Sequence, residues 1–207
     1  MENFENQFKV FIEQTMKTDA AHDINHVLRV VRTAKQLCKA EQARFEIVIP
    51  AAYLHDCFTY PKDHPERKSS AFIAADKAIE FLGEIDYPPE YFESIHHAII
   101  THSFSANVTP QTLEAEIVQD ADRLDALGAI GIARCIQVSA TFGTTFYSDD
   151  DPFCDLRKPD DKTYTVDHFY SKLFKLADTM KTSSGRHEAK KRTEFMRCYL
   201  EQLSMEI

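Results

Sequence analysis

The segment from residue 46 to residue 57, EIVIPAAYLHDC, constrains the fold of this chain more than any other, because it is apolar almost all round. A helix on the surface of a protein has a polar face, which this segment lacks. It therefore predicts a central, buried helix that other helices must surround. Pro50 falls near the start of this helix, where a proline is tolerated. The run closes on two adjacent titratable residues, His55 and Asp56.

Apolar residues at helical spacing predict further helices along the rest of the chain. Only five glycines are present, most of them where a helical pattern pauses, and no segment alternates as a strand would. We therefore expect an all-α fold, a single-domain helical bundle. The expected helices are residues 3–17, 22–42, 66–82, 88–102, 110–126 with Thr109 as the N-cap, 129–142, 166–180 and 185–204. Residues 146–165 have no period and are too long for an idle connector, which suggests a functional or mobile flap.

Composition narrows the classes of protein to which this chain can belong. A length of 207 residues fits one domain. The net charge of −9 argues against nucleic-acid binding and against anionic membranes, both of which need a basic surface. No segment approaches 18 apolar residues, and the N-terminus has no signal-peptide core. The five scattered cysteines favour a reducing cytosol, so we expect a soluble, cytoplasmic protein.

Two imidazoles and two carboxylates form a plausible four-ligand set for one divalent cation: His26, His55, Asp56 and Asp122. Neighbouring side chains on a helix point about 100° apart. His55 and Asp56 can therefore reach one ion only where a helix ends or another helix approaches. Neutral imidazole and carboxylate suit Mn, Fe, Co, Ni or Zn. The alternatives are a core histidine with ordinary partners at His26 and a buried structural salt bridge at Asp56.

The segment VQDADRLDALGAIGIAR adds Asp125, three residues after Asp122 and on the same side of a helix. Two carboxylates so close on a half-buried face repel each other unless cations neutralise them. One arrangement has Asp122 on the metal and Asp125 holding an arginine or lysine, or bonding to a ligand histidine. Asp125 could instead be a structural acid at the end of a helix.

The order of these four residues resembles the metal-dependent HD-domain phosphohydrolase superfamily, and in particular its small stand-alone bacterial branch, the YpgQ/YedJ-like proteins. The phrases that carry the resemblance are AHDINHVLRVVRTA, AAYLHDC, AIITHSFSA, VQDADRLDALGAIGIAR, HFYSKLFKLADTMKTSSGR and EAKKRTEFMRCYLEQL. The likeness spans nearly the whole chain. It implies one HD domain over residues 1–207, with a metal-site core at about 18–130 and C-terminal helices at about 165–204 packing on it.

The resemblance also implies a chemistry. His26, His55, Asp56 and Asp122 would coordinate one divalent metal ion, manganese above all, with Mg, Ni, Co, Fe or Zn as alternatives. A metal-activated water would attack phosphorus. The expected substrate is a nucleotide, a (deoxy)nucleoside triphosphate cleaved to monophosphate and pyrophosphate. The alternatives are a 5′-nucleotidase, a cyclic phosphodiesterase, or a metal-stabilised nucleotide-binding module without turnover.

Further candidates surround these ligands. The general base is open between Asp56, His22 and Asp23, with Asp125 as a further catalytic candidate. His97 and His102 have the order of a second-metal pair, but side chains five apart on a helix diverge by about 140°. We therefore expect them to contact phosphate or a weaker second ion. The expected cationic contacts of a phosphorylated substrate are Lys62, Arg67, Lys68 and Arg123, with Lys158 in the flap. The chain should be a monomer or homodimer.

Overall fold

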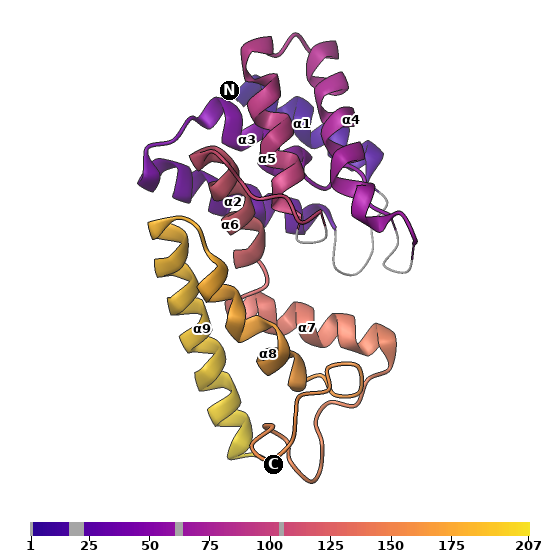
Figure 1. Ribbon diagram of the computed structural model, residues 1–207, viewed down its shortest axis with the longest axis vertical. Helices are drawn as coiled ribbons and strands as arrows, with labels where there is room; N and C mark the ends of the chain where they lie inside the picture. Colours follow the sequence, from indigo (N-terminus) through magenta and orange to yellow (C-terminus); the bar gives the residue numbers. More distant parts are fainter. Residues whose placement is uncertain (1, 17–22, 61–63, 104–105) are drawn as a thin grey trace. The chain divides into compact units, whose positions relative to one another are not determined.

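The computed structural model describes residues 2–16, 23–60, 64–103 and 106–207, and in these ranges the protein is all-α (Figure 1). The expected fold class is confirmed. Within the described ranges the only β-type pairing is an isolated bridge between Thr145 and Tyr164. The chain divides into two compact units, Met1–Asp122 and Arg123–Ile207.

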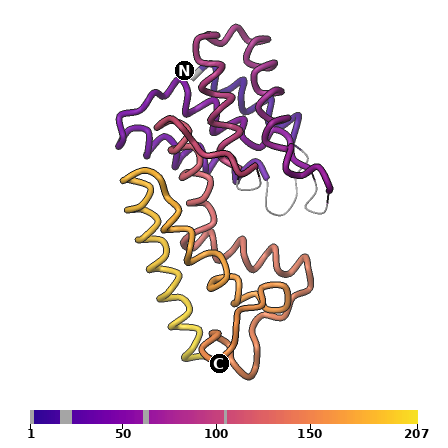
Figure 2. The backbone as a smooth tube through the Cα atoms, in the orientation of Figure 1, coloured from indigo at the N-terminus to yellow at the C-terminus, as the bar shows by residue number. Residues whose placement is uncertain are grey.

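In its described residues the first unit contains six helices and two short 3₁₀ turns, and Figure 2 traces its backbone from indigo through magenta. The helices are α1 (Glu2–Thr15), α2 (Ile24–Glu41), α3 (Phe45–Leu54), α4 (Ser70–Glu84), α5 (Phe92–His102) and α6 (Leu113–Leu124), which crosses into the second unit at its end. The turns η1 (Arg67–Ser69) and η2 (Pro89–Tyr91) lead into α4 and α5. Helix α3 packs against α1, α2 and α5, and α5 packs against α4.

Helix α3 is the central helix that its apolar sequence predicts, since every residue from Ile47 to Leu54 is buried. Pro50 lies inside this helix and has no N–H to donate to the carbonyl oxygen of Glu46, one turn earlier. The hydroxyl of Tyr87 donates to that carbonyl instead, at 2.7 Å. A side chain from outside α3 thus supplies the hydrogen bond that the proline removes.

The start of α6 differs from expectation. The sequence predicts Thr109 as the N-cap of a helix that begins at Pro110, whereas α6 begins at Leu113. The hydroxyl of Thr112 accepts a hydrogen bond from the backbone N–H of Ala115 at 3.2 Å, which is the bond of an N-capping residue. The prediction was wrong because a second threonine, three residues further on, caps the helix.

The second unit contains α7 (Gly128–Phe142), α8 (Asp167–Ser171), the 3₁₀ helix η3 (Leu173–Thr179) and α9 (Ser183–Ser204). Helix α7 packs against α9, and η3 packs against both α8 and α9. The continuous helix expected over 166–180 was wrong. At Lys172 the backbone leaves the helical region, with φ −134°, and the tighter 3₁₀ form follows.

The segment 146–165 is non-helical, as its lack of period predicts, and two carboxylates organise it. Asp151 accepts backbone hydrogen bonds from Asp155, Leu156 and Arg157 at 2.9–3.0 Å. Asp167, at 0% exposure, binds both terminal nitrogens of Arg157 at 2.5 and 2.8 Å. The functional role expected of this segment, and of Lys158 within it, stays a prediction.

All five cysteines are free thiols, as expected. Among the helices of the described ranges, none is both long and apolar enough to cross a membrane. The division of the chain into a core at about 18–130 with C-terminal helices packing on it stays a prediction.

Candidate metal centre

The four expected ligands come from three helices of the first unit. His26 lies in the first turn of α2, His55 and Asp56 follow the last residue of α3, and Asp122 lies near the end of α6. Asp23 caps α2, because its carboxylate accepts the backbone N–H of His26 at 2.8 Å. Burial would raise the pKa of Asp23, but this hydrogen bond lowers it below its ordinary value. Asp23, which the sequence suggests as a catalytic residue, therefore fixes the turn of α2 that carries the expected ligand His26.

The adjacency of His55 and Asp56 has the explanation that the sequence suggested, because α3 ends at Leu54 and both residues lie beyond it. The Nδ1 atom of His55 lies 2.9 Å from the carbonyl oxygen of Ala52. A carbonyl oxygen can only accept, so Nδ1 carries the hydrogen and Nε2 keeps its lone pair. Burial lowers the pKa of His55 to about 4, which makes the imidazole neutral at pH 7.

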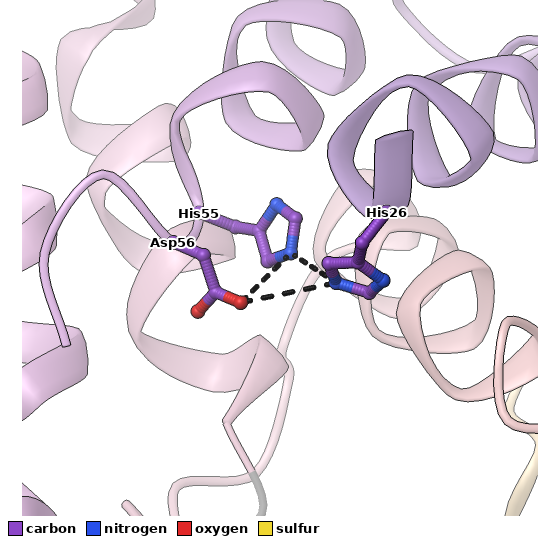
Figure 3. Close-up of side chains that lie close together, drawn as sticks. All are labelled: His26, His55 and Asp56. Atoms are coloured by element: carbon purple, nitrogen blue, oxygen red, sulfur yellow. Dashed lines mark hydrogen bonds and ion pairs between the residues drawn. The ribbon is translucent and has the colours of Figure 1, made fainter. Parts of the chain in front are cut away.

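The ligand atoms of His26, His55 and Asp56 face one another (Figure 3). The Nε2 atoms of His26 and His55 are 3.4 Å apart, and Asp56 Oδ2 lies 3.8 Å from the first and 3.6 Å from the second. Asp122 Oδ1 lies 3.4 Å from His26 Nε2 and 3.9 Å from His55 Nε2. Two imidazole nitrogens and two carboxylate oxygens thus converge at the end of α3.

This arrangement fits a divalent cation. Ligand atoms that bind one ion at about 2.1 Å stand about 3.0–3.4 Å apart for right-angled to tetrahedral geometry. The separations here, 3.4–3.9 Å, start at the upper end of this range and exceed it slightly, so a small inward movement would complete the site. Converging lone pairs and negative charges repel in the absence of a cation. A mixed imidazole and carboxylate set suits first-row transition metals. The cluster can therefore hold a metal ion.

Asp122 is the most accessible of the four, since 29% of its side chain is exposed. Burial would raise the pKa of this carboxyl, but a hydrogen bond from His26 and the nearby imidazoles of His55 and His102 hold it well below its ordinary value. The carboxylate is therefore ionised at neutral pH, as a metal ligand must be.

The residues that follow Asp122 have structural partners in the second unit. Asp125, at 3% exposure, accepts a hydrogen bond from Arg134 at 2.6 Å, which is one of the two arrangements that the sequence left open. Arg123 donates to the carbonyl oxygen of Thr179 at 3.0 Å. A catalytic role for Asp125 and a substrate role for Arg123 stay predictions.

His102 lies against the cluster, whereas His97 binds elsewhere. His102 Nε2 is 3.5 Å from Asp56 Oδ1, and its Nδ1 is 2.5 Å from the carbonyl oxygen of Ile99. Burial would lower the pKa of His102, but the hydrogen bond and the charge of Asp56 raise it overall. His97 Nε2 instead accepts the backbone N–H of Gln111 at 3.0 Å. The two histidines have different partners, and their roles toward phosphate or a second ion stay predictions.

Two of the expected cationic contacts, Arg67 and Lys68, lie in η1. Arg67 donates to the carbonyl oxygen of Tyr60 at 2.6 Å, and Lys68 is exposed. Lys62 and His22 lie outside the described residues. The expected roles of the three cationic residues as substrate contacts, and of His22 as a general base, stay predictions.

Sequence reasoning missed the partners that orient the two buried imidazoles. His55 and His102 each donate to the carbonyl oxygen of the residue three positions earlier, Ala52 and Ile99. The contact of His102 with Asp56 was also missed. A histidine in the last turn of a predicted helix is the signal that could have suggested the bonds to Ala52 and Ile99, because the carbonyls of that turn lack helical donors.

The sequence of this chain, including the residues of the cluster, matches known proteins. Residues 23–127, which include all four expected ligands, match the family model of the HD domain. The protein YpgQ of Bacillus subtilis is 30% identical over 206 residues, covering 97% of this chain and 92% of that protein.

The crystal structures that match almost the whole chain include the following two. One is YpgQ of Bacillus subtilis in complex with ADP, which is 30% identical with a TM-score of 0.76 and covers 100% of this chain and 96% of that one. The other is an HD-superfamily hydrolase from Bacillus thuringiensis, which is 30% identical with a TM-score of 0.77 and covers 99% of this chain and 97% of that one.

Proposed function

The chain belongs to the HD domain family, and on that premise we propose that it is a metal-dependent phosphohydrolase that acts on nucleotides. One of its relatives, the protein from Bacillus thuringiensis, is an HD-superfamily hydrolase. Within this class, we propose that it cleaves (deoxy)nucleoside triphosphates to monophosphate and pyrophosphate. The observation that carries the proposal is the convergence of two imidazoles and two carboxylates beyond the end of α3.

His26, His55, Asp56 and Asp122 would hold one divalent ion, which we propose to be Mn²⁺. Such an ion would polarise a phosphoryl oxygen and make hydroxide available at neutral pH. The protein's own contribution is to fix the donor atoms before the ion arrives. The carbonyl of Ala52 orients His55, and the Asp23 cap orders the first turn of α2.

Asp56 is the best-placed candidate for orienting the attacking water. Its two oxygens face different groups, Oδ2 toward the two imidazoles and Oδ1 toward His102. His102 therefore holds the carboxylate in one rotation. Asp23 and Asp125 already accept hydrogen bonds from the backbone of α2 and from Arg134. We therefore rank Asp56 above both of them for this role.

The complex of YpgQ with ADP supports a nucleotide as substrate. A protein of net charge −9 needs local cations to bind a polyphosphate. We propose that Arg67 and Lys68 supply them. Lys68 is exposed, and Arg67 uses one of its five N–H donors in the hydrogen bond to the carbonyl oxygen of Tyr60. We also propose a cytoplasmic monomer or homodimer.

The test is phosphate release by the Mn²⁺-loaded protein over a panel of nucleoside and deoxynucleoside triphosphates, with and without added inorganic pyrophosphatase. Orthophosphate that appears only with pyrophosphatase supports the proposal. Orthophosphate released directly from monophosphates would indicate a 5′-nucleotidase, and cleavage of a cyclic nucleotide would indicate a phosphodiesterase.

The Asp122→Ala variant separates an enzyme from a binding module. An enzyme should lose turnover by several orders of magnitude, whereas a module would lose only metal affinity and stability. Asp76→Asn is a matched control, since it also removes a carboxylate of the first unit but one whose side chain is 76% exposed and paired with His96. No turnover of any nucleotide by metal-loaded wild-type protein would exclude the proposed activity.

A further inference from the structure

Gln119 joins the two helices that approach the candidate metal centre from one side. Its Nε2 donates to the carbonyl oxygen of Thr101 at 2.6 Å, which links α6 to the last turn of α5. Gln119 is 3% exposed and Thr101 is 0% exposed, so water does not compete for this bond. It is therefore a rigid connection inside the first unit.

Both ends of this link adjoin residues of the centre. Thr101 immediately precedes His102, whose Nε2 faces Asp56. Gln119 lies three residues before Asp122, so the two side chains occupy neighbouring positions on one flank of α6. The bond thus fixes the distance between the turn that carries Asp122 and the turn that carries His102.

The second polar atom of the Gln119 amide has a different environment from the first. Because the Thr101 carbonyl requires a donor, Nε2 must point toward it, and Oε1 points elsewhere. Oε1 is buried and has no hydrogen-bond partner among the described residues. On α6, Ile117, Val118 and Ala121 are 0% exposed. An apolar side chain of equal length would remove the unpaired Oε1, but it would also take the donor from the buried carbonyl of Thr101.

We propose that Gln119 is a positioning residue of the metal centre. Its hydrogen bond ties α6, which carries Asp122, to α5, whose His102 faces Asp56, and so keeps both carboxylates around the same ion. The proposal rests on the proposed function only in requiring that the cluster binds a divalent metal. It predicts that loss of the Gln119 amide weakens metal binding more than it weakens the fold.

The experiment uses the full-length protein and Mn²⁺ as the probe. Gln119→Met removes both polar atoms at similar length, and Gln119→Glu places a carboxylate oxygen against the Thr101 carbonyl. Tyr87→Phe is the matched control, since it removes another bond from a buried side chain to a backbone carbonyl, at the opposite end of α3 from the ligands. For each protein, calorimetric titration gives the Mn²⁺ dissociation constant, and melting gives the Tm without metal.

We expect the dissociation constant of Gln119→Met to rise about tenfold, the lower end of the range for groups that orient metal ligands. Its metal-free Tm should fall no more than that of Tyr87→Phe, whose Mn²⁺ affinity should stay within about twofold of wild type. An unchanged Mn²⁺ affinity in Gln119→Met, or an equal loss in Tyr87→Phe, would overturn the inference. Should Gln119→Glu fail to fold, Gln119→Met decides the question. Wild-type protein that binds no Mn²⁺ would instead refute the proposed function.

Discussion

The hydrogen bond from Tyr87 to Glu46 predicts an energetic coupling between Pro50, which removes a hydrogen bond from α3, and Tyr87, which replaces it. Pro50 leaves the Glu46 carbonyl without its helical donor, and the Tyr87 hydroxyl takes that place at 2.7 Å. Tyr87→Phe should therefore leave this carbonyl unbonded in the wild-type background. In a Pro50→Ala background the backbone N–H of residue 50 can reach it, so the same substitution should cost less.

The magnitude follows from the environment of the bond. Tyr87 is 3% exposed, but Glu46 is itself exposed near the start of α3, so water can partly replace the lost donor. We expect Tyr87→Phe to lower the free energy of unfolding by about 1–2 kcal/mol. For a protein of this size, that is a fall in Tm of about 2–8 °C. The coupling between the two substitutions should be about 1 kcal/mol.

The assay is a double-mutant cycle by urea unfolding, followed by far-UV circular dichroism because the chain has no tryptophan. The four proteins are wild type, Tyr87→Phe, Pro50→Ala and the double variant. Additive effects, with a coupling below about 0.3 kcal/mol, would refute the reasoning. They would show that the Tyr87 hydroxyl does not compensate for the proline.

Further predictions concern the metal and the second unit. Mn²⁺ at about 100 times its dissociation constant should raise the unfolding free energy by about 2.7 kcal/mol, which corresponds to a rise in Tm of about 5–11 °C. The His26→Ala variant should lose this shift, whereas the control variant Asp76→Asn should keep it. Asp167→Asn should lower the stability of the second unit by about 2–3 kcal/mol, less than for a fully buried pair because 24% of the Arg157 side chain is exposed. Burial would raise the pKa of Asp167, but hydrogen bonds from Arg157 and the Asp160 backbone hold it below its ordinary value. Its contribution is therefore present above about pH 4, the unfolded pKa, and is lost as pH falls further. In melts at pH 7 and pH 3, Asp167→Asn should lose less Tm on acidification than wild type, and an equal loss would contradict this assignment.

The pairing of His55 with Asp56 shows what local geometry allows a sequence to predict. Side chains one apart diverge on a helix, so the pair required either a helix end or an approaching helix. The structure confirms the first solution, since α3 ends at Leu54. The apolar run before the pair predicted the burial of α3 equally well. Both inferences depend on residues close together in sequence, where the period of the helix decides.

Partners far apart in sequence could not be predicted in this way. The α6 helix has two threonines that could cap it, and only the folded backbone selects Thr112. Gln119 looks like an ordinary polar residue of a helix until the carbonyl of Thr101, 18 residues earlier, meets it. Likewise, the sequence offered several partners for Asp125, and in the folded chain Arg134 lies close enough to bind it. Tertiary packing decides each of these, and a hydrophobic pattern does not encode it residue by residue.

The carbonyl of Ala52 has a consequence for competition between protons and metal ions at His55. The lone pair of Nε2 can bind either a proton or a metal ion. In an exposed histidine a proton would occupy it below about pH 6.5. His55 is completely buried and its pKa is about 4, so protons compete effectively only in much more acidic solution. Because Nδ1 already donates to Ala52, the ring needs no change of tautomer to capture an ion. The end of one helix thus keeps this ligand ready for metal across the whole range of pH in which cells work.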